Sequence, residues 1–111
     1  MIRNISKNKV LIKKARLAKG MHHQILGLMF KSKISYGLVF SFYIENKHYL
    51  HTCFMKEPID ILFLDSNRRV LKVMRNVKPW RFDIFGKGKY VIELPAGKSF
   101  NTKIGDKISF K

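Results

Sequence analysis

The stretch HTCFMKEPIDILFLD, residues 51–65, decides the fold because two apolar runs meet in it at one proline. Pro58 has no amide hydrogen to give to a β-ladder, so we expect it at the first residue or the edge of a strand. Successive side chains of the strand that follows point to opposite faces. One face holds Ile59, Ile61 and Phe63, and the other holds Asp60, Leu62 and Leu64. The sequence therefore predicts a strand that is apolar on both faces, with one carboxylate among leucines.

Asp60 is the residue in this stretch that requires an explanation. A carboxylate on a buried face needs hydrogen-bond or charge partners. It is either a ligand-binding group or a general base whose pKa is raised by apolar neighbours, or a structural aspartate that accepts backbone N–H groups near the Pro58 turn. His51 is the nearest candidate partner. A hydrolase or transferase would need both side chains within hydrogen-bond reach.

The preceding apolar run, residues 49–55, places three metal-binding residue types on one strand face. His51, Cys53 and Met55 offer donors that suit Cu(I) or Zn. Same-face neighbours lie about 6.7 Å apart, so three ligands on one ion would strain the strand. We therefore expect no metal site. We also expect no cofactor, because the GKGK segment at residues 86–89 lacks the Ser/Thr and the strand–loop–helix frame of a phosphate loop.

Composition predicts a single soluble domain, residues 1–111, with 46% apolar residues. One cysteine excludes an internal disulfide framework and is typical of a reducing compartment. The opening MIRNISKNKV has no apolar signal-peptide core, and no run approaches the roughly 18 apolar residues of a membrane span. We expect a cytoplasmic protein without a membrane partner.

The net charge of +16 results from 23 basic and 7 acidic residues. The first acidic residue in the sequence is Glu45. This balance is typical of a lysine-rich solvated surface. The alternative is nucleic-acid or other polyanion binding through the basic segments 1–33 and 68–81. Trp80 and Arg81, with the lysines of the GKGK segment, form the best mixed aromatic and basic cluster.

The rest of the chain reads mostly as short strands. A phase slip at a double lysine predicts a bulge within a strand over residues 9–18. Apolar residues at helical spacing predict one helix near residues 21–30. Further strands are expected at residues 37–44, 70–77, 90–94 and 107–110. Turns are expected at 45–47, at 66–68 with Asn67 at a positive φ, and at Gly105-Asp106, and a loop over 80–89.

These elements predict a mainly β fold. About seven short strands spaced as hairpins, with the one helix near residues 21–30, indicate a small antiparallel barrel-like or sandwich domain.

Four motifs occur in a fixed order from about residue 18 to the C-terminus. They are Gly27-Leu28-Met29-Phe30, the stretch 51–65, Lys78-Pro79-Trp80-Arg81, and Glu93-Leu94-Pro95-Ala96-Gly97 with the later Gly105-Asp106. Together they resemble domain-of-unknown-function family 192. The resemblance implies a small, predominantly β domain of archaea and bacteria with no established activity, cofactor or catalytic residue. Arg68 stands where the family usually has a glycine.

The leading functional hypothesis is an uncharacterised β domain that binds a small polar ligand. Its pocket would be lined by His51, Met55, Asp60, Trp80 and Arg81, a histidine and an aspartate set in apolar strands beside a basic aromatic turn. Nucleic-acid binding through the basic surface is the alternative. An enzyme using Asp60 and His51 is a further alternative, but no catalytic residue is assigned.

Overall fold

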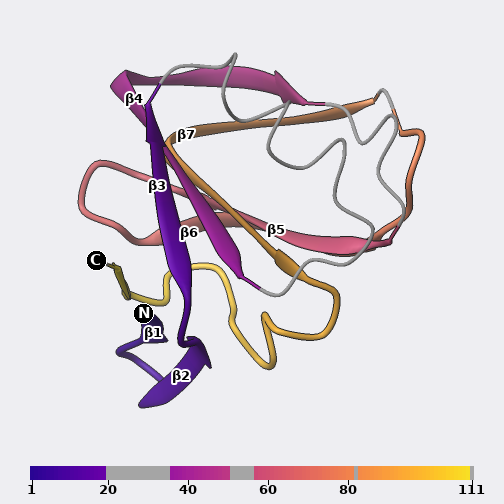
Figure 1. Cartoon of the computed structure of the whole chain (residues 1–111). Coiled ribbons are helices and arrows are strands. Elements are labelled where there is room, and N and C mark those ends of the chain that lie inside the picture. Colours follow the sequence, from indigo (N-terminus) through magenta and orange to yellow (C-terminus); the bar gives the residue numbers. More distant parts are fainter. Residues whose placement is uncertain (20–35, 51–56, 82, 111) are drawn as a thin grey trace.

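The computed structural model describes residues 1–19, 36–50, 57–81 and 83–110, which form eight β-strands (Figure 1). The strands are β1 (Ile2–Asn4), β2 (Lys9–Ile12), β3 (Ala15–Lys19), β4 (Gly37–Leu50), β5 (Ile59–Leu64), β6 (Val70–Val77), β7 (Ile84–Pro95) and β8 (Ile108–Phe110). In this part of the chain no helix has the length and apolarity to cross a membrane. The prediction of a mainly β fold is confirmed. The helix predicted near residues 21–30 lies outside the described residues.

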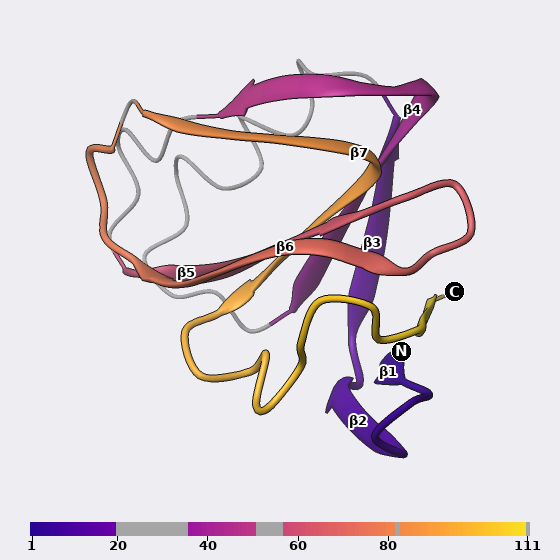
Figure 2. The same cartoon turned by 180° about the vertical axis from the view of Figure 1, so that it is seen from behind.

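The strands make two sheets, one of five strands in the order β3-β4-β7-β5-β6 and one of three in the order β2-β1-β8. Neighbouring strands are antiparallel except β3 and β4, which are parallel. The ladder between β4 and β7 is irregular between Ser41 and Asn46. There β4 and β7 both bend, and the large sheet curls over on itself (Figures 1 and 2). The first and last described strands, β1 and β8, pair with each other in the small sheet.

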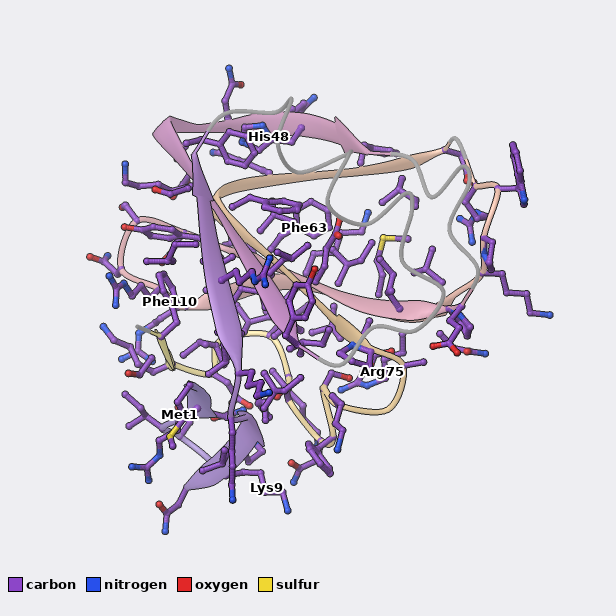
Figure 3. The ribbon with its side chains drawn as sticks, in the orientation of Figure 1. Met1, Lys9, His48, Phe63, Arg75 and Phe110 are labelled. Atoms are coloured by element: carbon purple, nitrogen blue, oxygen red, sulfur yellow. The ribbon has the colours of Figure 1, made fainter. Side chains whose placement is uncertain are left out.

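Two apolar clusters cover the two faces of the five-stranded sheet. Phe63 belongs to the cluster inside the curve, where Figure 3 shows it between β7 and β5. The other cluster packs the five-stranded sheet against β1, β2 and β8. As predicted, β5 is buried on both faces: Ile59, Ile61 and Phe63 belong to the first cluster, and Leu62 and Leu64 to the second.

The prediction of one bulged strand over residues 9–18 is wrong. β2 ends at Ile12 and β3 begins at Ala15, and the two strands belong to different sheets. The exposed double lysine, Lys13 and Lys14, is the crossing between the sheets. The phase slip in the sequence therefore marks a change of sheet. Sequence reasoning also did not predict β1, which pairs with both β2 and β8.

Pairing between β4 and β7 corrects two further predictions, the turn at residues 45–47 and the loop over 80–89. β4 continues through residues 45–47 because β7 runs beside it, with Asn46 opposite Gly88 and His48 opposite Gly86. A Cβ atom at Gly86 would lie 2.7 Å from the ring of Phe63. Glycine therefore allows this strand to lie directly over an aromatic ring.

The turn after β5 occurs where it was predicted, with a different residue at the positive φ. Arg68 has φ 63°, whereas Asn67 was expected there. Oδ1 of Asp65 accepts hydrogen bonds from the N–H groups of Asn67 and Arg69. The Arg68 guanidinium carbon lies 4.1 Å from the ring centroid of Phe110, a contact that favours this conformation.

Candidate functional site

Asp60 is 1% exposed, and both of its oxygens are used within the fold. Oδ1 accepts the N–H of Asn76 at 2.9 Å. Oδ2 accepts the N–H groups of Gly97 and Ser99, each at 3.0 Å, and the Ser99 hydroxyl at 2.6 Å. This geometry favours the structural interpretation of Asp60, because no oxygen of the carboxylate faces solvent. Its donors come from two other segments rather than from the Pro58 turn.

The other predicted site residues are placed only in part. His51 and Met55 lie outside the described residues, so their distance from Asp60 stays a prediction. Trp80 has φ 65° and is 55% exposed. The Arg81 guanidinium donates two hydrogen bonds to Asp83, at 2.6 and 3.0 Å. The hydrogen bond and charge of Arg81 lower the pKa of Asp83.

A dense group of cations lies at the end of the molecule that carries the three-stranded sheet. We call the surface formed by residues 1–14 and 96–107 the basic end. Figure 3 shows Lys9 and the N-terminal Met1 at this end of the molecule. Its basic side chains, all exposed except the half-buried last one, are Arg3, Lys7, Lys9, Lys13, Lys14, Lys98, Lys103 and Lys107. Asp106 is the one acidic residue in these two segments.

The loop of residues 96–107 is fixed by a second buried carboxylate besides Asp60. The Asn4 amide donates to Asp106 Oδ2 at 2.9 Å and to Thr102 Oγ1 at 3.0 Å. The Lys103 N–H also donates to Asp106, and the Lys7 ammonium lies 3.3 Å from it. Burial works to raise the pKa of Asp106, but the hydrogen bonds from Asn4, Lys103 and Lys7 outweigh it and lower the pKa. The loop is therefore tied to β5 at one end and to β1 at the other.

Phe100 projects from the middle of this fixed loop. It is 41% exposed and has φ 50°, a conformation that costs a bulky residue about 1–3 kcal/mol. The ammonium groups of Lys9 and Lys98 lie 4.5 and 5.9 Å from the centroid of its ring. The fold thus places two cations over an exposed aromatic ring.

A shallow surface groove of about 430 Å³ adjoins the same loop. Val73, Arg75, Thr102, Lys103 and Ile104 line it. Arg75 donates a short hydrogen bond to the carbonyl of Thr102, so one of its two cations also anchors the loop. The groove extends the basic end along β6.

The acidic side chains do little to neutralise this surface. All seven lie within the described residues, and Asp60, Glu93 and Asp106 are buried. Two others form ion pairs outside these segments, Glu45 with Lys87 at 3.7 Å and Asp83 with Arg81. The positive field of the basic end therefore has no exposed acid within its own segments.

Glu93 is the third buried acid, and its carboxyl group differs from those of Asp60 and Asp106. It lies on β7 between Leu38 of β4 and Ile61 of β5, and is 6% exposed. Its Oε2 atom has no hydrogen-bond partner within the part of the chain described here. Burial raises the pKa of Glu93 to about 8. From sequence, Glu93 was named only as part of a family motif and Phe100 was not named. The available signals were one acid inside the run VIEL and one aromatic inside the polar loop GKSFNTK.

The family model DUF192, described as uncharacterised ACR, matches residues 2–110. The chain belongs to the DUF192 family. The match begins at residue 2, so β1 and β2 belong to the DUF192 domain, although the sequence motifs begin only near residue 18. The family is uncharacterised, which agrees with the resemblance stated above.

Similar chains include UPF0127 proteins of Pyrococcus and Thermococcus species. A UPF0127 protein of Pyrococcus horikoshii is 43% identical over 115 residues, which cover 99% of this chain and 98% of the relative. A UPF0127 protein of Thermococcus sibiricus is 36% identical over 116 residues, covering 100% of this chain and 75% of the relative.

Two solved bacterial structures share the fold. A Sinorhizobium meliloti protein described as a candidate transcription regulator superposes with TM-score 0.78 at 24% identity, covering 86% of this chain and 79% of its own. A Novosphingobium aromaticivorans protein of unknown function gives TM-score 0.74 at 25% identity, covering 86% and 74%. The DUF192 fold described here is therefore also seen in crystal structures.

Proposed function

We propose that this DUF192 domain binds nucleic acid through the basic end. The observation that carries the proposal is the charge imbalance of the basic end. Its two segments hold eight basic side chains and a single acid, which is buried. Nucleic acids carry a dense row of phosphates, and cations that contact them gain free energy by releasing condensed counterions. Because strands and anchored loops fix the backbone here, these cations share one surface when the partner arrives.

The two basic segments predicted from sequence, residues 1–33 and 68–81, contribute differently to the basic end. Within the first, residues 1–14 supply much of the basic end, and residues 20–33 lie outside the described residues. The second segment supplies β6, where two of the cations are used by the fold. Lys72 donates to the carbonyl of Phe85 at 2.6 Å, and Arg75 donates to the carbonyl of Thr102. The proposal therefore rests on the first segment and the 96–107 loop.

The compartment fits this partner. Cys53 is the one cysteine of the chain, which is typical of a protein in a reducing environment. We accordingly place the protein in the cytoplasm, where it meets nucleic acid. Thiol titration of protein purified without an oxidant is expected to find Cys53 as the free thiol. A stable intermolecular disulfide in the native cell would contradict this placement.

The test measures binding of a labelled 20-nucleotide strand and of a labelled 20-base-pair duplex. Fluorescence anisotropy reports the binding at salt concentrations from about 50 mM upward. We expect binding that weakens steeply with salt, with a slope of about 0.7 per contacted phosphate on a single strand and 0.9 on duplex. The double variant Lys13→Glu/Lys14→Glu is expected to bind at least about tenfold more weakly.

The matched control is Lys47→Glu/Lys78→Glu, which changes net charge by the same amount on β4 and after β6. It is expected to weaken binding much less. Failure of the wild-type protein to bind either probe at low salt overturns the proposal. Equal losses for the two double variants would also overturn it, because they would assign binding to overall charge and not to the basic end.

A further inference from the structure

We infer that the basic end selects single-stranded over duplex nucleic acid, with Phe100 as a platform on which one base stacks. This inference rests on the proposed nucleic-acid binding and assigns a ligand class to the same surface. Its basis is an exposed aromatic ring on an anchored loop with two lysine ammonium groups over it, which is the combination that single-strand-binding surfaces use.

Phe100 lies outside both apolar clusters, so the described core does not need its ring. The backbone nonetheless fixes it. The N–H of Phe100 donates to the carbonyl of Gly97 at 3.3 Å, and the N–H of Thr102 donates to the carbonyl of Ser99 at 3.1 Å. A phenylalanine kept at a positive φ with an exposed ring is a conformation that the surrounding hydrogen bonds impose.

Asp60, on the buried strand β5, supplies much of the hydrogen bonding that fixes the backbone of this loop. Its Oδ2 atom holds Gly97 and Ser99, the residues that begin the turn carrying Phe100. A ring that is ordered before binding loses little conformational entropy when a base arrives. The buried carboxylate that first suggested a ligand site is therefore a positioning residue for the exposed ring.

Two lysines complete the platform. Their ammonium groups lie over the Phe100 ring, 4.5 and 5.9 Å from its centroid, so a stacking base displaces an ammonium group from the ring face and brings its own phosphates within reach of that group. A single strand can turn an unstacked base toward the ring. A duplex keeps its base faces covered by neighbouring base pairs, so Phe100 gives it no stacking surface. Cations serve both ligands, whereas the ring serves only the single strand.

Phe85 provides a contrast on the same molecule. It is 50% exposed, and the Lys72 ammonium lies 4.6 Å from its ring centroid. That ammonium, however, donates a hydrogen bond to the carbonyl of Phe85 itself, and the residue lies on β7 outside the basic end. Phe85 matches Phe100 in residue type, in exposure and in having a nearby lysine. It lies outside the positive electrostatic field that the cations of the basic end produce.

The experiment measures anisotropy of labelled oligo-dT (20 nucleotides) and of a 20-base-pair duplex with wild type, Phe100→Ala, Phe100→Trp and Phe85→Ala. Phe100→Ala is expected to weaken oligo-dT binding about five- to hundredfold and to leave duplex binding within about twofold. Phe100→Trp is expected to keep or improve oligo-dT binding, and Phe85→Ala to change neither. Circular dichroism and melting temperature verify that each variant is folded.

A spectroscopic readout tests stacking directly. Trp80 is the one tryptophan of the chain, so Trp80→Phe/Phe100→Trp moves the indole to the platform. Oligo-dT is expected to quench its emission, and the duplex is not. Equal loss of both ligands in Phe100→Ala, or unchanged oligo-dT binding, overturns this inference while leaving the proposed function standing. Absence of binding by the wild type to both probes overturns the proposed function itself.

Discussion

The Ser99 hydroxyl donates a 2.6 Å hydrogen bond to Oδ2 of Asp60, and this contact joins the core strand β5 to the loop at the basic end. The N–H groups of Gly97 and Ser99 converge on the same oxygen. One buried carboxylate thus satisfies three donors of a surface loop, and the apolar strand and the exposed loop are stabilised together. Damage to this contact should affect both stability and the position of Phe100.

Replacing Ser99 by alanine should lower the free energy of unfolding by about 1.5–3 kcal/mol, the usual contribution of a hydrogen bond to a charged acceptor. Urea denaturation followed by circular dichroism measures it. The matched control is Ser66→Ala in the exposed turn after β5, which should stay within about 0.5 kcal/mol of wild type. Equal effects of the two substitutions would show that the Asp60 contact contributes no net stability.

The sequence was sufficient to predict β5 and the strand after it. Alternation placed Ile61 and Leu62 on opposite faces, and the turn residues before Val70 gave the limits of the return strand, which β6 matches from Val70 to Val77. Both inferences use contacts between near neighbours in the chain. The partners of Asp60, by contrast, lie up to 39 residues away, and one sequence contains no signal for that pairing.

The errors have the same origin. Residues 45–47 are polar, as in a turn, but the ladder with β7 keeps them extended. Gly86 and Gly88 are typical of a loop, yet their role is to let a strand approach Phe63 and the carbonyl of Leu64. In each case a long-range contact overrides the local preference, and the candidate site at the basic end is assembled from the two ends of the chain.

The pH dependence of stability should reveal Glu93. Its folded pKa, about 8, lies above the ordinary value of 4.5, so the unfolded chain loses this proton first as pH rises. Glu93 therefore lowers the free energy of unfolding between those two pH values, by at most about 1.4 kcal/mol per pH unit, and the loss stops growing above the folded pKa. Urea denaturation across this range measures the slope.

Glu93→Gln is the control, because it keeps the shape of the side chain and cannot ionise. The stability difference between Glu93→Gln and wild type should widen in favour of the variant as pH rises through this window. Glu93→Leu should be more stable than wild type in alkaline buffer, since it removes a buried polar group that has no partner in the described residues. Parallel pH profiles for wild type and Glu93→Gln would show that this carboxyl does not titrate in the way its burial implies.

Asp106 should show the opposite pH dependence. Its folded pKa is lowered by the hydrogen bonds from Asn4, Lys103 and Lys7, so it contributes stability above the pKa of the unfolded chain, about 3.9. That contribution is lost as pH falls through the folded value. Asp106→Asn should therefore be less stable than wild type at neutral pH, and the difference should close in strongly acidic buffer.

The control for Asp106 is Asp83→Asn, which removes an acid from an exposed ion pair with Arg81. Exposed pairs contribute little, so its effect at neutral pH should be small. Because Asp106 fixes the loop that carries Phe100, its substitution should also weaken oligo-dT binding, whereas Asp83→Asn should not. A neutral-pH stability of Asp106→Asn equal to that of Asp83→Asn would contradict the buried network.

The approach of β7 to Phe63 can be tested by adding one methyl group. In Gly86→Ala the new Cβ would lie 2.7 Å from two ring atoms of Phe63, so the ring or the strand must move. Overpacking of this kind typically costs about 1–3 kcal/mol. Lys87→Ala, an exposed neighbour on the same strand, should cost much less. Adding Phe63→Leu to Gly86→Ala should recover part of the loss, because the smaller side chain relieves the clash. Strictly additive effects in this double-mutant cycle would mean that the two positions do not contact, and that another constraint keeps glycine in the strand.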